Sequence, residues 1–229
     1  MKRFLGEGIP GIDPASLKGK LIVLEGPDGS GRSTQIGLLT DWLEERGHAV
    51  VHVGLKRSTL VGPELARAKR GNILSPRTLS LFYATDFADQ MENRIIPSLR
   101  AGFLVLADRY IYTLMARDII RGGEPEWLRS VYGIALVPDL VLYLRVTPQK
   151  LLERYIYRGL ELDYWESGMD LGYSRGTWYD SFIRYQTEVH RIFMTLQGQY
   201  GFSVVNGMRH PRTILRELQA LIEYAITSP

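Results

Sequence analysis

The sequence predicts a three-layer α/β fold, in which a five-stranded parallel sheet is flanked by helices. Two observations support this prediction. Five short apolar runs recur along the 229 residues, and the segments between them have helical periodicity. Each run is continuously hydrophobic rather than alternating, which is typical of parallel strands that are buried on both faces. The predicted strands span residues 21–24, 49–53, 103–107, 140–144 and 202–205.

The first predicted strand leads through a glycine-rich loop into a helix. Gly26, Gly31 and Ser33 fall on the template G-x-x-x-x-G-K-[ST], and the helix runs on until Gly47. The N–H groups of such a loop point inward at phosphate oxygens, and the N-terminal end of the helix adds positive potential. The pattern therefore predicts nucleotide binding. The residues assigned to it are Gly26, Pro27, Asp28, Gly29, Ser30, Gly31, Arg32, Ser33 and Thr34.

One position departs from the template, because Arg32 replaces the lysine. Arginine keeps the charge and can bind phosphate through two hydrogen bonds, but its planar group is bulkier and more rigid than an ammonium. The sequence leaves two possibilities: the loop is rebuilt around a guanidinium and works, or catalysis is lost and binding is retained. Ser33 is predicted to place its hydroxyl on a magnesium ion that bridges the phosphates.

Polar residues follow the second and third predicted strands. Arg57 lies just after the second strand, and Asp108-Arg109-Tyr110 follows the third. Ligands bind at the carboxyl ends of parallel strands, and a carboxylate after an apolar strand is costly unless it meets magnesium, a hydroxyl or a cation. A structural pair of Asp108 and Arg109 would explain these residues equally well on its own. Their position opposite the glycine-rich loop favours a functional role.

Two helices near the C-terminus are predicted from apolar residues at helical spacing. Both are assigned to the core or to a dimer face. The apolar positions are Tyr185, Val189, Ile192 and Leu196 in the first, and Ile214, Leu218, Leu221 and Ile222 in the second.

Composition narrows the class of protein. Hydrophobic residues make up 45% and charged residues 23%, as in a compact enzyme. The absence of cysteine excludes disulfides, zinc–thiolate sites and thiol chemistry. No apolar run is long enough to span a membrane, so we expect a cytoplasmic protein. The net charge of +3 comes without a basic run that contains aromatic residues, so we expect no nucleic-acid polymer as a partner.

These motifs together resemble the thymidylate kinase family of nucleoside monophosphate kinases, over nearly the whole chain. Residues 25–35 are similar to the family phosphate loop E-G-x-D-G-x-G-K-[ST]-T-Q, Asp108-Arg109-Tyr110 to its D-R-[YH] motif, and 138–140 to its P-D-L element. The resemblance implies a P-loop kinase fold with a short lid, and a homodimer. It also implies direct transfer of a phosphoryl group from ATP, with Mg²⁺, to a nucleoside monophosphate, with dTMP as the leading candidate.

The resemblance also assigns roles to residues. The catalytic group contains Arg32, Asp108, Arg109 and Arg158, and the metal is held by Ser33 and Asp108. In the acceptor site, Asp28 reaches toward the sugar, Tyr83 stacks on the base, and the phosphate is held by Arg57 and Arg109. The full acceptor set is Asp28, Arg57, Tyr83, Phe87, Arg109, Thr113 and Arg117.

Three departures from the family pattern concern the acceptor. Phe87 stands where the family has an arginine that reads the thymine edge, and Arg117 and Asp118 replace a tyrosine and a glutamine. Loss of a hydrogen-bond donor that reads a base can change base choice. Two alternatives therefore remain open: a kinase with another (deoxy)nucleotide or a nucleoside as acceptor, and a nucleotide-binding protein without catalysis.

The expected domain organisation is simple. Residues 1–18 are expected to form a loose lead-in, and 19–229 a single domain with its lid at about 154–178. The lid arginine of the family is Tyr164 here, so Arg158 or Arg175 is expected to supply the charge. A disordered surface loop is the alternative, but aromatic residues such as Tyr164 and Trp165 argue against it.

Overall fold

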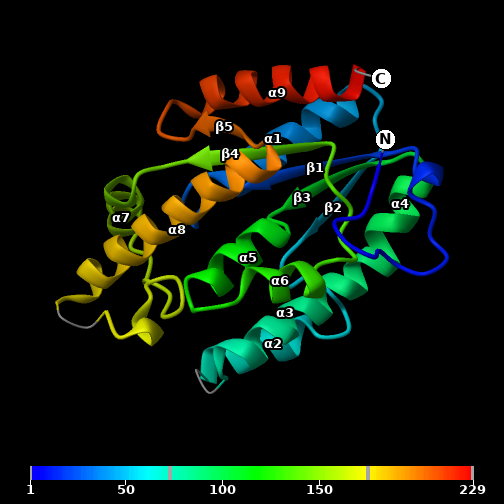
Figure 1. Ribbon diagram of the computed structural model, residues 1–229. Helices are drawn as coiled ribbons and strands as arrows, with labels where there is room; N and C mark the ends of the chain where they lie inside the picture. The colour runs from blue at the N-terminus through cyan, green and yellow to red at the C-terminus, as the bar shows by residue number, and fades with distance from the viewer. Residues whose placement is uncertain (1, 72–73, 174–175, 228–229) are drawn as a thin grey trace.

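Figure 1 shows the computed structural model of the chain, which describes residues 2–71, 74–173 and 176–227. Its five strands form one parallel sheet in the order β2-β3-β1-β4-β5. Each strand lies within one residue of its predicted range, so the predicted α/β fold is confirmed. The strands are β1 (Lys20–Glu25), β2 (Val50–Gly54), β3 (Leu104–Asp108), β4 (Leu140–Arg145) and β5 (Ser203–Asn206).

Helices cover both faces of this sheet, which gives three layers (Figure 1). On one face, Ile22 and Leu24 of β1 pack with α1 (Arg32–Glu45) and α9 (Pro211–Thr227). On the other face, the alternate residues Leu21 and Val23 belong to the core that contains α3 (Pro76–Gln90), α5 (Ile111–Ile119) and α8 (Trp178–Tyr200). The other α-helices are α2 (Gly62–Gly71), α4 (Ile96–Arg100), α6 (Pro125–Val131) and α7 (Pro148–Tyr157).

The strand register aligns the loops that carry the candidate site. Asp108 at the end of β3 pairs with Leu24 of β1 on one side and with Gly54 of β2 on the other. The three strands therefore end at one level. As a result, the loops that follow β1, β2 and β3 meet at the carboxyl edge of the sheet.

The N-terminal segment is held against the domain. Phe4 pairs with Leu136 in an antiparallel bridge, and the N–H of Leu5 donates to the carbonyl oxygen of Ala135. Leu17 is buried, and the segment continues through a short 3₁₀ helix (Pro14–Ser16) into β1. Residues 2–18 thus contain little regular structure, and apolar packing and backbone hydrogen bonds hold them against the domain.

Within the described part of the chain, no helix combines the length and hydropathy that crossing a membrane requires.

Candidate active site

Two loops meet at the carboxyl ends of β1 and β3. The glycine-rich loop 26–31 joins β1 to α1, and Arg109 and Tyr110 join β3 to α5. The loops exchange ion pairs: Arg32 Nε lies 2.8 Å from Asp108 Oδ1, and Arg109 Nη2 lies 2.7 Å from Asp28 Oδ1. Each side contributes one carboxylate and one guanidinium to a single cluster.

The glycine-rich loop has a backbone that other residues rarely adopt. Gly26, Gly29 and Gly31 have φ values of 152°, 79° and 99°. A Cβ atom on Gly26 would lie 3.1 Å from the carbonyl oxygen of Leu144, so the loop packs directly on β4. Helix α1 begins immediately after Gly31. This arrangement presents backbone N–H groups at a helix N-terminus, where phosphate oxygens bind.

Arg32 is buried inside this loop. Its Nη1 donates to the carbonyl oxygens of Gly26 and, at 2.7 Å, of Pro27, while its Nη2 lies 3.4 Å from Asp28 Oδ1. With the Nε bond to Asp108, the guanidinium reaches four acceptor groups on different sides. The single ammonium nitrogen of a lysine cannot span such a set. The geometry therefore favours a loop rebuilt around arginine.

The electrostatics of the cluster depend on its opposite charges. Burial alone would raise the pKa of Asp28, but Arg109 and Arg32 outweigh burial and hold that pKa well below its ordinary value. Two buried polar atoms of the cluster, Arg109 Nε and Ser30 Oγ, have no hydrogen-bond partner among the residues that the structure describes. Buried polar groups are normally paired, so these atoms suit an anionic ligand.

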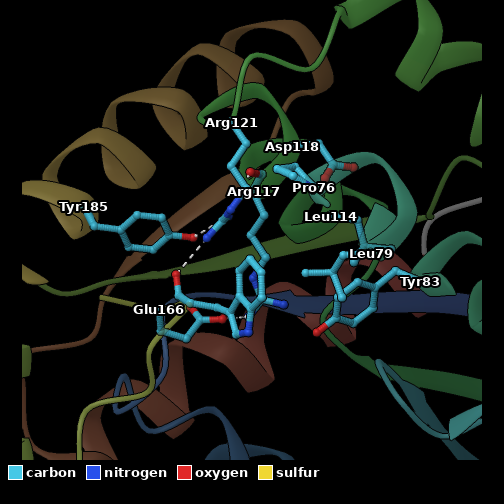
Figure 2. Close-up of a pocket in the computed structure, with 10 residues that line it drawn as sticks. Pro76, Leu79, Tyr83, Leu114, Arg117, Asp118, Arg121, Glu166 and Tyr185 are labelled. Atoms are coloured by element: carbon cyan, nitrogen blue, oxygen red, sulfur yellow. Dashed lines mark hydrogen bonds and ion pairs between the residues drawn. The ribbon is translucent and has the colours of Figure 1, made fainter. Parts of the chain in front are cut away.

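A pocket lies beside this cluster, between α3, α5, α8 and the segment that follows α7 (Figure 2). Tyr83 lies across the pocket from Glu166 and Tyr185. The guanidinium of Arg117 forms an ion pair with Glu166 and lies 5.9 Å from the centre of the Tyr83 ring. The residues that line the pocket are Pro76, Leu79, Tyr83, Leu114, Arg117, Asp118, Arg121, Trp165, Glu166 and Tyr185.

A smaller cavity connects this pocket to the glycine-rich loop. Arg117, Glu166 and Tyr185 line both spaces, and the smaller one also touches Gly26 and Arg109. The loop, the Arg109 side chain and the pocket with Tyr83 therefore follow one another in space. The cationic groups thus lie at one end of this series and the aromatic side chain of Tyr83 at the other.

Contacts with other parts of the chain hold one portion of the predicted lid in place. Arg121, just after α5, binds both carboxylate oxygens of Asp170 at 2.7 and 3.1 Å, and donates to the carbonyl oxygen of Trp165 at 2.8 Å. The α8 side chains of Ser181 and Gln186 hold the next backbone groups of the same segment. Residues 163–171, called the inner lid below, thus form a fixed wall of the pocket.

Comparison with known proteins decides the family. The sequence profile of the thymidylate kinase family matches residues 24–171, which is more than half of the chain. The chain belongs to the thymidylate kinase family.

Several relatives cover most of the chain. A "Probable thymidylate kinase 2" from Saccharolobus solfataricus is 33% identical over 207 residues, which are 90% of this chain and 96% of that protein. A "Probable thymidylate kinase" from Thermococcus kodakarensis is 31% identical over 212 residues, 88% of this chain and 96% of that protein. A "Thymidylate kinase" from Thermoanaerobacter sp. is 32% identical over 144 residues, which are 60% of this chain and 71% of that protein.

The three residues that depart from the thymidylate kinase pattern do not all line the pocket that contains Tyr83. Phe87 is buried, with its ring 5.1 Å from Tyr110 and 5.9 Å from Tyr132, and it does not line the pocket that contains Tyr83. Arg117 and Asp118 do line that pocket. The arginine that the family uses at position 87 therefore has no direct replacement there, whereas Arg117 brings a guanidinium to the pocket from α5.

Other assigned residues lie at the edges of the site. Arg57 Nη2 is 3.7 Å from Asp108 Oδ2, and Ser33 is exposed in the first turn of α1. Thr113 donates its hydroxyl to Glu25. Arg158 is exposed at the end of α7, and Arg175 lies outside the described residues.

Sequence reasoning missed three residues of the site. Arg154, one turn before Arg158, donates to the carbonyl oxygens of Gly29 at 2.9 Å and of Ser30 at 3.1 Å. Its spacing from Arg158 on one helix was the available signal. Arg121 carried no signal because its partner Asp170 is distant in sequence. The third residue, Glu25, is part of the quoted loop motif.

Proposed function

We propose that this chain transfers the γ-phosphoryl group of ATP to dTMP and forms dTDP, with Mg²⁺. The family assignment and the printed names of the relatives support this activity. The observation that carries the proposal is that the parts of the site adjoin one another: Gly26 and Arg109 line the smaller cavity, and this cavity shares lining residues with the pocket that contains Tyr83. A donor phosphate and an acceptor nucleotide can meet there.

On the donor side, residues 26–34 bind the phosphates of ATP through the backbone N–H groups that they carry, Pro27 having none. Arg32 keeps the loop in shape and adds positive charge beside the transferred group. Arg154 supports the outer side of the loop through Gly29 and Ser30, and donates to the carbonyl oxygen of Gly207 at 2.8 Å. Arg158, exposed nearby, is the lid arginine that closes over the junction of donor and acceptor.

On the acceptor side, Arg109 and Arg57 bind the phosphate of the monophosphate. Asp28 reaches toward the sugar, and Thr113 and Arg117 line the path between phosphate and base. Tyr83 stacks on the base, and Phe87 supports the acceptor site from the core behind it. Arg109 is paired with Asp28 now, and its orphaned Nε gives it a donor for a phosphate oxygen.

The reaction is a direct, in-line displacement. An oxygen of the acceptor phosphate attacks the γ-phosphorus, and the bond from that phosphorus to the ADP oxygen breaks, so that no enzyme side chain forms a covalent bond. Catalysis of this kind rests on positioning and on neutralising charge. The cations around the junction, Arg32, Arg109 and Arg158, supply that charge, and closure of the segment around Arg158 excludes water.

Magnesium fits the oxygen groups of this site. The Ser33 hydroxyl and the Asp108 carboxylate are of the ligand type that Mg²⁺ prefers. Among the described residues, no group of three acidic or histidine side chains could hold a metal alone. A site with few protein ligands suits Mg²⁺, which Ser33 and Asp108 would hold together with phosphate oxygens and which would supply neutralisation of the phosphate charge. A homodimer and a cytoplasmic location are part of the same proposal.

A second acceptor class is favoured by one observation. Asp118 lines the base pocket with a carboxylate, where it accepts a hydrogen bond from Ser80 at 2.5 Å, and Phe87 leaves no donor at its own position. A carboxylate that accepts hydrogen bonds suits a base with an exocyclic amino group, because that group donates them. A kinase for another deoxynucleotide is therefore the alternative.

A panel of acceptors tests the proposal. ADP release from ATP is measured with Mg²⁺ against dTMP, the other deoxynucleoside monophosphates and the nucleosides. Preferred turnover of dTMP supports the proposal, and preference for an amino-bearing base supports the alternative. Tight ATP binding without turnover of any acceptor would overturn both and indicate a nucleotide-binding protein.

A further inference from the structure

Glu25, the last residue of β1, is fully buried and connects the two loops of the site. Its Oε1 accepts the backbone N–H of Tyr110 at 3.0 Å and that of Thr113 at 3.2 Å, and its Oε2 accepts the Thr113 hydroxyl. A carboxylate on β1 therefore caps the first turn of α5. The favourable end of the helix dipole adds to these hydrogen bonds.

Arg109 lies between the two anchor points on β1. Its own N–H donates to the carbonyl oxygen of Leu24 at 3.0 Å, and the next N–H, that of Tyr110, donates to Glu25. Arg109 has a φ of 71°, in the left-handed region that is unfavourable for a residue with a Cβ. Such a conformation persists only where its surroundings fix it. Here the two hydrogen bonds to the end of β1 fix the backbone on both sides of the Arg109 side chain.

We propose that Glu25 is a positioning residue for the acceptor phosphate: it holds the turn in which Arg109 adopts its left-handed backbone and so aims the guanidinium at the phosphoryl junction. The inference rests on the proposed function, in which Arg109 binds that phosphate. Gly26 directly follows Glu25. Glu25 therefore positions both the start of the glycine-rich loop and the turn that carries Arg109.

Two variants of Glu25 separate the effect of its hydrogen bonds from that of its charge. One has a side chain of the same shape without the charge, and the other has a shorter side chain with the charge. In Glu25→Gln, Oε1 can still accept both N–H groups, and Nε2 can donate to the Thr113 hydroxyl, which also accepts. In Glu25→Asp, the charge is kept but the carboxylate is one methylene short of its partners. Positioning by hydrogen bonds predicts that Gln preserves function and Asp does not, whereas a purely electrostatic role predicts the reverse.

The measurement is the ratio of two affinities, for dTMP and for thymidine, obtained by titration calorimetry. Of the groups of the acceptor, Arg109 is proposed to bind the phosphate alone, so loss of its aim raises the Kd of dTMP by about tenfold, the effect of about one charge-assisted contact, and changes that of thymidine much less. We expect this change in Glu25→Asp, and values within about twofold of wild type in Glu25→Gln. A general loss of structure would weaken both ligands equally.

Three results would overturn the proposal: a Glu25→Asp variant with the wild-type ratio, a Glu25→Gln variant with a reduced ratio, or equal weakening of both ligands. If Glu25→Asp does not fold, Thr113→Val removes only the hydroxyl bond and is compared with Thr113→Ser by the same ratio. A lower preference for the monophosphate in the Val variant alone supports the proposal, and equal ratios contradict it. Failure of the proposed function is seen separately, as wild-type enzyme that does not turn over dTMP; the ratio is then taken with the monophosphate and nucleoside that it does use.

Discussion

Arg32 and Asp108, which are 76 residues apart in the sequence, form an ion pair of 2.8 Å between the glycine-rich loop and the end of β3. The pair places the residue that replaces the family lysine in contact with the residue proposed to organise magnesium. The carbonyl oxygens of Gly26 and Pro27 hold the same guanidinium from the other side. This geometry explains how a phosphate loop can retain its shape with arginine at the lysine position.

Replacing Arg32 by lysine is expected to reduce activity. Lysine keeps the charge but loses contacts that need a planar group with several nitrogens, so kcat/KM should fall by at least about tenfold, the effect of one charged hydrogen bond. Steady-state kinetics with ATP and dTMP measure the change. Arg46→Lys, at the far end of α1, is the matched control. Activity equal to or above that of wild type would indicate a loop that has merely drifted from lysine.

Arg109→Ala is expected to abolish most turnover while leaving the donor site intact. Removal of a charge-stabilising group costs about 10²- to 10³-fold in kcat for comparable sites. The Kd of ATP should change little, because the loop amides bind the donor phosphates. Arg191→Ala, which breaks an exposed ion pair on α8, serves as a control. A normal rate in Arg109→Ala would remove this residue from the mechanism.

The fold was predicted more completely than the site. Continuous apolar runs located all five strands because parallel strands are buried on both faces, and the glycine spacing located the phosphate loop. The inner lid was less accessible to prediction. The sequence predicted only a lid at about 154–178, whereas Glu166 and Asp170 are held by arginines that lie 49 residues away in the sequence. Periodicity and local motifs carry no information about such pairings.

The burial of Phe87 has a similar cause. Its place in the motif suggested a residue that faces the acceptor, but its ring packs edge-on against Tyr110 and Tyr132. Apolar surface stabilises the fold most when it is removed from water, so an aromatic side chain at this position turns to the core. The sequence identified the departure from the family but not the direction of the side chain.

Removal of Arg121 is expected to loosen the inner lid. Its partner Asp170 is nearly buried, and loss of one member of a buried ion pair costs about 3 kcal/mol. Arg121→Gln should therefore lower the free energy of unfolding and raise the KM of the acceptor more than that of ATP. Hydrogen exchange of residues 163–171 should increase. Arg129→Gln, on the exposed side of α6, should leave exchange unchanged, and an unchanged inner lid in Arg121→Gln would contradict its role.

The stability of the protein should decrease in mild acid partly through His190. Burial, and to a lesser degree Arg145, lower the pKa of this histidine below its usual 6.5. The unfolded chain therefore takes up a proton at a higher pH than the folded protein, and stability falls as the pH drops through 6.5 toward the folded pKa. Thermal unfolding between pH 8 and pH 5 should show a smaller decrease in His190→Gln than in wild type. An identical decrease in both would contradict this assignment, and His210→Gln controls for loss of an exposed histidine.

The central claim is direct phosphoryl transfer between two nucleotides that meet at the Arg32–Asp108 and Arg109–Asp28 pairs. It is tested by following a label from the γ-phosphate of ATP during reaction with dTMP and Mg²⁺. Direct transfer predicts that the label appears in dTDP, with none bound to the protein and little released as inorganic phosphate. Bound ATP whose label never reaches any nucleoside monophosphate would contradict it.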